Sequence, residues 1–74
     1  MNPKPKWFKK PNQKRVWFCE DGKIITDESY TMHGGIRLKF YFVYANATDR
    51  DRGINYATGQ SFKQAKELAH QEAA

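Results

Sequence analysis

In the segment IRLKFYFVYA, residues 36–45, large apolar side chains recur at every second position. Side chains in a strand point alternately to its two faces, so this period predicts a strand with one face against a core. The set expected to point inward is Ile36, Leu38, Phe40, Phe42 and Tyr44. The set expected to point outward is Arg37, Lys39, Tyr41, Val43 and Ala45. The outer face should therefore present Arg37, Lys39 and Tyr41 in a row, either as a solvated sheet surface or as a binding surface.

Two short apolar runs precede this strand, at residues 16–19 and 24–26. Between them lies Asp21-Gly22, the strongest local signal for a hairpin turn in the chain. We therefore expect an antiparallel hairpin with a tight turn at residues 20–23. Residues 27–35 are polar and contain two glycines, which predicts either a longer connection or, if the two preceding strands extend through the segment, a flared end of their hairpin.

After the central strand, the charged segment at residues 46–53 predicts a turn, and residues 54–57 predict a short returning strand antiparallel to its predecessor. Ser61 and Gln64 have the spacing of a capping box, so a helix should begin at Ser61. Its apolar stripe has helical spacing and consists of Phe62, Ala65, Leu68, Ala69 and Ala73. This helix is expected to lie against the inner face of the sheet.

The expected fold is therefore α+β: a small antiparallel three-stranded, possibly four-stranded, sheet packed against one C-terminal helix. Residues 16–74 form this single domain, and residues 1–15 precede it as an extended basic arm. A chain of 74 residues buries little of its surface, so the core should be thin.

The arm carries the excess charge of the chain. It holds six of the thirteen basic residues and no acid, while the rest of the chain has seven basic and eight acidic residues, so the net charge of +5 comes from the arm and the rest is nearly neutral. Three prolines prevent a continuous helix there. The basic residues of the arm are Lys4, Lys6, Lys9, Lys10, Lys14 and Arg15.

Two apolar aromatic residues, Trp7 and Phe8, lie within this arm. Lysines attract phosphates through counterion release and aromatic rings stack on bases, so the combination favours nucleic acid as a partner. Two alternatives remain open: Trp7 or Phe8 folds back over the core of the domain, or the arm only improves solubility.

The C-terminal sequence GQSFKQAKELAHQEAA, residues 59–74, resembles the end of a double-stranded RNA-binding domain, in which three strands are followed by a serine, a basic cluster, an Ala-Lys pair and an alanine-rich helix. This resemblance implies phosphate contacts by Lys63 and Lys66. The expected order of elements is also similar to the arm-type DNA-binding domains of tyrosine integrases and to plant AP2 domains, which lay a sheet face into the DNA major groove. That resemblance implies contacts by Arg37, Lys39 and Tyr41, with Trp17 as a further candidate.

No catalytic or metal-binding pattern is evident. Cys19, His33 and His70 are the only soft ligands, and no pair of them has zinc-finger spacing, so a buried thiol and surface imidazoles are expected. No nucleophile constellation or phosphate-binding glycine pattern accompanies them. We expect no enzyme activity, no cofactor and no metal. The single cysteine and the lack of a long apolar run favour a cytoplasmic protein without membrane contact.

The leading hypothesis is a small nucleic-acid-binding protein, with DNA ahead of RNA and duplex DNA as the favoured partner. The alternative is a protein-protein interaction module, such as a small regulator or inhibitor that docks on another protein. A monomer or a weak homodimer formed through open strand edges is expected. The candidate nucleic-acid-binding residues are Lys4, Lys6, Trp7, Lys9, Lys10, Lys14, Arg15, Arg37, Lys39, Tyr41, Lys63 and Lys66.

Overall fold

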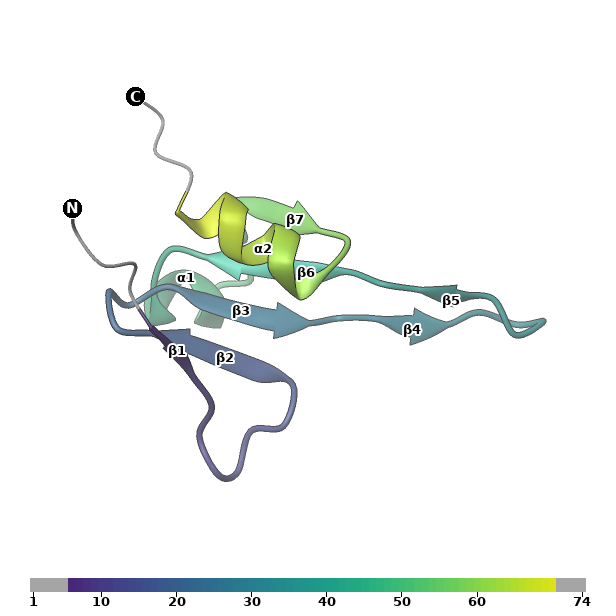
Figure 1. The fold of residues 1–74 in the computed structure, drawn as a ribbon, viewed down its shortest axis with the longest axis horizontal. Helices are drawn as coiled ribbons and strands as arrows, with labels where there is room; N and C mark the ends of the chain where they lie inside the picture. The colour runs from purple at the N-terminus through teal and green to yellow at the C-terminus, as the bar shows by residue number, and fades with distance from the viewer. Residues whose placement is uncertain (1–5, 71–74) are drawn as a thin grey trace.

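The computed structural model describes residues 6–70, and within them the main element is a five-stranded antiparallel sheet in the order β1-β2-β3-β6-β7 (Figure 1). Its strands are β1 (Trp7–Phe8), β2 (Val16–Cys19), β3 (Ile24–Asp27), β6 (Tyr41–Tyr44) and β7 (Ala57–Gly59). Two helices are described, α1 (Ala47–Asp51) after β6 and α2 (Phe62–Ala69) after β7. The predicted α+β class, with an antiparallel sheet packed against a C-terminal helix, is confirmed.

A two-stranded ribbon projects from this sheet, formed by β4 (Tyr30–Thr31) and β5 (Arg37–Leu38) (Figure 1). The ribbon continues the hairpin of β3 and β6 without a change of register, from Ile24 opposite Tyr44 to Thr31 opposite Arg37. Residues 27–35 are therefore largely one side of an extended hairpin, but the hairpin that extends is that of β3 and β6, not that of the first two predicted strands.

The ladder is interrupted where the ribbon leaves the sheet. There the Ser29 hydroxyl accepts a hydrogen bond from the backbone nitrogen of Phe40, at 3.2 Å. The Asp27 carboxylate accepts one from the backbone nitrogen of Ser29, at 2.9 Å, and the Arg15 guanidinium donates to the carbonyl oxygen of Ser29, at 2.8 Å. Ser29 is only 7% exposed. Side-chain hydrogen bonds thus replace the missing ladder bond and join the ribbon to the body.

Helix α2 covers the face of the sheet that carries Ile25 and Val43, both 0% exposed, and packs Ala65 and Ala69 against them. Gly59 in β7 permits this approach, because a Cβ atom at Gly59 would lie 2.9 Å from the backbone nitrogen of Ala65. Small residues on both elements therefore determine where the helix lies.

The predicted assignment of faces for residues 36–45 is wrong for the face that α2 covers, whereas Tyr44 is buried and Arg37 and Lys39 are exposed as expected. Val43, expected outside, is fully buried beneath α2, and Tyr41 is half-buried beside it. Ile36, expected inside, is 61% exposed. The opposite face has a second apolar cluster, made of Val16, Ile24 and Tyr44 with Phe18 and Phe42 packed against it. Because Phe42, Val43 and Tyr44 make both faces apolar, alternation alone does not indicate which face the helix covers.

The elements indicated by local sequence signals were predicted more accurately. The turn at residues 20–23 is present, with Gly22 at a φ of 100° and the Cys19 backbone nitrogen bonded to the Lys23 carbonyl oxygen at 2.9 Å. Ser61 caps α2, and its hydroxyl accepts from the backbone nitrogen of Gln64 at 3.1 Å. Ala73, predicted to extend the apolar stripe, lies outside the described residues.

Three other predictions need correction. The charged segment at residues 46–53 contains α1 instead of a simple turn, because the Asn46 side chain caps a helix by accepting from the Asp49 backbone nitrogen at 2.8 Å. The returning strand is Ala57–Gly59, later than predicted. The sheet has five strands because part of the predicted arm, Trp7–Phe8, pairs with β2 as an edge strand.

Candidate nucleic-acid interface

Four aromatic rings meet where the flank of α2 lies over the first strands of the sheet. Trp17 is 4.6 Å from Phe62 between ring centroids and 6.0 Å from Tyr41, and Trp7 is 6.3 Å from Phe62 in an edge contact. All four side chains are half-buried. We call Trp7, Trp17, Tyr41 and Phe62 the aromatic shelf. Each of these side chains therefore keeps part of its surface exposed to solvent.

Two lysines lie over rings of the aromatic shelf. The Lys9 ammonium is 5.0 Å from the centroid of Trp17, and the Lys66 ammonium is 4.9 Å from that of Phe62. Such cation–π contacts contribute roughly 0.5–1 kcal/mol at exposed sites and leave the ammonium group able to bind an anion. The shelf therefore combines aromatic faces with positive charge.

The lysines of the arm are not neutralised by carboxylates within residues 6–70. The ion pairs found in that range involve Arg15, Lys23 and His70. Lys10 instead lies 4.3 Å over the ring of Phe18 on the other face of the sheet, where Phe8 stacks on Phe18 at 6.0 Å. The positive charge of the described lysines of the arm is therefore available to solvent, whereas Arg15 is paired with Asp27.

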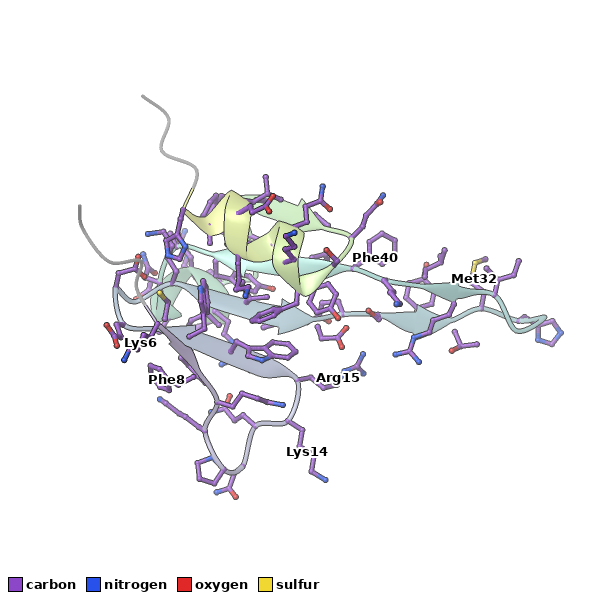
Figure 2. All side chains as sticks on the ribbon, in the orientation of Figure 1. Lys6, Phe8, Lys14, Arg15, Met32 and Phe40 are labelled. Carbon is purple, nitrogen blue, oxygen red and sulfur yellow. The ribbon has the colours of Figure 1, made fainter. Side chains whose placement is uncertain are left out.

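The other basic residues of the arm lie apart from the aromatic shelf. Lys6 precedes β1 and Lys14 lies on the loop between β1 and β2, both exposed (Figure 2). Arg15 is 3.4 Å from the Asp27 carboxylate. Lys4 lies outside the described residues. The predicted arm residues thus occupy both faces and the connecting loop instead of one extended tail.

The ribbon holds two more of the predicted residues. Arg37 and Lys39 are exposed, and Thr31 lies directly opposite Arg37. Because the register is unbroken, alternation places Arg37 and Lys39 on the side of the hairpin that carries Tyr41 and α2. Tyr41, predicted to stand in a row with them on an open surface, is instead half-buried in the aromatic shelf.

Helix α2 supplies the last two predicted cations, Lys63 in its first turn and Lys66 in its last turn. Lys63 is exposed and Lys66 is half-buried. The first turn of α2 lies toward the end of the sheet from which the ribbon projects (Figure 1). A lysine in the first turn of a helix opposes its dipole, so helix stability does not explain the charge of Lys63, whereas Lys66 in the last turn is favourable to the dipole.

Sequence patterns indicated some of these residues and missed others. Trp17 was a secondary candidate, and Phe62 was expected only as part of the core stripe. Thr31 was not considered, because residues 27–35 carry no strand signal. The pairing of Trp17 with Phe62 depends on how α2 crosses the sheet, and no local pattern shows it.

The ribbon also has an apolar side. Tyr30 is 52% exposed, Met32 44% and Ile36 61%, and Tyr30 stacks on Phe40 at 5.9 Å. Figure 2 shows Met32 far out on the ribbon and Phe40 near the point where the ribbon leaves the sheet. One side of the ribbon is therefore basic and polar, and the other exposes apolar side chains.

Comparison with protein-family models, with curated proteins and with solved structures finds no match for this chain. No helix in the described part of the chain has the length and apolar character needed to cross a bilayer.

Proposed function

We propose that this protein binds duplex DNA, with the β4–β5 ribbon in the major groove and the aromatic shelf with its lysines against the flanking backbone. The observation that carries the proposal is the position of Arg37, Lys39, Lys9 and Lys66. All four belong to the side of the sheet that bears α2, and none of them is paired with a carboxylate within residues 6–70.

The shape of the ribbon supports a duplex with an accessible major groove. The major groove of B-form DNA admits a two-stranded ribbon, whereas that of A-form RNA is deep and narrow. Thr31 and Arg37 face each other on one side of the ribbon and supply a hydroxyl and a guanidinium that match base edges. The proposal therefore gives DNA preference over RNA.

The lysines over the aromatic shelf and on α2 supply the electrostatic part of the binding. Lys9, Lys63 and Lys66 would contact phosphates on either side of the groove, and counterion release would make affinity fall steeply with salt. Phosphate contacts position the protein, while Arg37 provides selectivity. The proposed cytoplasmic location agrees with the free thiol of Cys19.

The test is fluorescence anisotropy with labelled DNA duplexes, RNA duplexes and single strands at several salt concentrations. Arg37→Ala should weaken binding to a preferred duplex roughly 5- to 150-fold, as expected for loss of one base contact. Lys9→Ala should reduce the slope of log affinity against log salt by about 1. Arg52→Ala is the matched control, because Arg52 follows α1 at the end of the sheet opposite the ribbon (Figure 1).

Three results would contradict the proposal: affinity that does not depend on salt, equal binding of RNA and DNA duplexes, or equal effects of Arg37→Ala and Arg52→Ala. Preferential binding of single strands would also contradict it, because the aromatic shelf would then act as a stacking platform without the ribbon.

The exposed apolar side of the ribbon favours a second candidate function, docking on another protein. Tyr30, Met32 and Ile36 together form the kind of surface that protein interfaces bury. This candidate predicts no measurable binding of duplex DNA and a partner that co-purifies in stoichiometric amounts. Ile36→Asp should abolish that association, and sedimentation equilibrium would show whether the partner is a second copy of this chain.

A further inference from the structure

Three metal-ligating side chains from distant parts of the sequence converge at the end of α2. Cys19 ends β2, Asp21 lies in the following turn, and His70 directly follows α2. The Cys19 sulfur, a carboxylate oxygen of Asp21 and a ring nitrogen of His70 all lie within 4.8 Å of one another. We propose that these three residues bind a zinc ion that fastens the end of α2 to the β2–β3 turn.

The distances between the ligand atoms fit a tetrahedral zinc ion. The Cys19 Sγ atom is 3.6 Å from His70 Nε2, and His70 Nε2 is 3.5 Å from Asp21 Oδ2. Typical zinc bonds to sulfur, nitrogen and oxygen place such ligand pairs about 3.3–3.6 Å apart at tetrahedral angles. The remaining pair, Cys19 Sγ and the Asp21 carboxylate, lies within 4.8 Å, so rotation of side chains is enough for the three residues to share one ion, and water would complete the coordination.

The arrangement differs from a catalytic Cys-His-Asp triad. In a triad, the acid contacts one ring nitrogen of the histidine and the nucleophile contacts the other. Here both the Cys19 sulfur and the Asp21 carboxylate lie against His70 Nε2. Side chains that converge on one point in this way are placed as ligands are, not as a proton relay.

The charge balance of the site is also suitable. The buried Cys19 thiol has to lose its proton to act as a ligand. The Asp21 carboxylate accepts hydrogen bonds from the Lys23 ammonium at 2.9 Å and from the Lys23 backbone nitrogen at 3.1 Å. When Zn²⁺ binds, the thiol proton leaves to solvent and the metal replaces Lys23 as the partner of the carboxylate. One thiolate and one carboxylate then neutralise the two positive charges.

A metal at this position would stabilise the small body. Cys19 and His70 are 51 residues apart in the sequence, so the ion would close a long loop. The His70 ring is also 5.6 Å from that of Trp7, which links the end of α2 to the edge strand β1. Domains of this size often depend on such a link. This inference stands independently of the proposed binding of DNA.

The test is titration of the reduced full chain with Co²⁺, followed by displacement with Zn²⁺. We expect one Co²⁺ per chain, a thiolate-to-cobalt charge-transfer band and the visible bands of tetrahedral cobalt, all lost when Zn²⁺ is added. Zinc at 100 times its dissociation constant should raise the thermal midpoint by roughly 10 °C or more.

Variants separate this site from adventitious binding. Cys19→Ser should remove the charge-transfer band, and His70→Gln should weaken zinc binding at least roughly tenfold. His33→Gln is the matched control, because His33 lies at the tip of the ribbon and is exposed. Since Cys19 is buried, His70→Gln decides the question if Cys19→Ser does not fold. The proposal is overturned if no charge-transfer band forms, or if His33→Gln weakens binding as much as His70→Gln.

Discussion

The two ends of the β3–β6 hairpin have the same strand register, but a helix covers only one of them. In the body, Ile25 and Val43 face each other across the ladder and are both 0% exposed beneath α2. In the ribbon, Ile36 is 61% exposed and Tyr30 52%. The register is the same at both ends, so strand pairing does not distinguish them. The difference is burial beneath a helix, which makes one end a core and leaves the other as a surface.

This difference predicts a division of roles. Stability should depend on the body, where apolar area is removed from water. Recognition of a partner should depend on the ribbon, where apolar and basic side chains remain exposed. Ser29 and Asp27, at the junction, should determine how firmly the two parts are joined. A substitution in one part can therefore be compared with a matched control substitution in the other.

The largest expected effect is a difference in stability between isoleucine-to-alanine substitutions at the two ends of the hairpin. Ile25→Ala should lower the free energy of unfolding by about 2–5 kcal/mol, because it leaves a cavity beneath α2. Ile36→Ala should change it by less than about 0.5 kcal/mol, because the side chain is exposed. Urea unfolding followed by circular dichroism measures both. Equal losses would mean that the ribbon is covered in solution, for example by a second chain.

A smaller effect is expected at the junction. Ser29→Ala removes the hydroxyl that accepts from the Phe40 backbone nitrogen and leaves this N–H without a partner. We expect a loss of about 1 kcal/mol and faster amide hydrogen exchange at Phe40, without faster exchange at Val43. Thr31→Ala, in the exposed strand β4, is the control and should change neither quantity appreciably. Equal acceleration at Phe40 and Val43 would show that the ribbon and the body open together.

The features of the fold that could be predicted are those whose sequence signals act over a few residues. Asp21-Gly22 and the Ser61 cap act within a few residues, and the hairpin turn and α2 were predicted from them. The side of the sheet covered by α2 depends on Gly59 and Ala65, which approach each other only after folding. The apolar residues 42–44 suit either face, so no local pattern could decide between them.

The candidate site shows the same limit. The basic residues of the arm were indicated by composition and those of α2 by a family resemblance, but the positions of Lys9 over Trp17 and of Lys66 over Phe62 were not. The arm was expected to be separate because of its prolines, yet Trp7 pairs with Cys19 and packs against the core. The cluster of Cys19 and His70 joins two segments with no recognisable spacing. Such contacts depend on tertiary packing, which spacing along the chain does not encode.

The smallest expected effect concerns acid stability at the junction. Burial would raise the pKa of Asp27, but hydrogen bonds from Ser29 and the nearby Arg15 guanidinium outweigh it and lower that pKa below the ordinary value of 3.8. A carboxylate with a lowered pKa in the folded state stabilises the fold above the pKa of the unfolded chain. That contribution is lost as the pH falls through the folded pKa.

Asp27→Asn should therefore be less stable than the original chain at about pH 6, by no more than roughly 1 kcal/mol, and the difference should disappear well below about pH 4. Chemical unfolding at both pH values measures it, with Asp51→Asn on the exposed surface of α1 as the control for removal of one charge. If the difference persists unchanged in acid, the carboxylate charge of Asp27 does not join the ribbon to the body. The hydrogen bonds of Ser29 would then hold the junction alone, and the ribbon would be coupled to the body through uncharged groups.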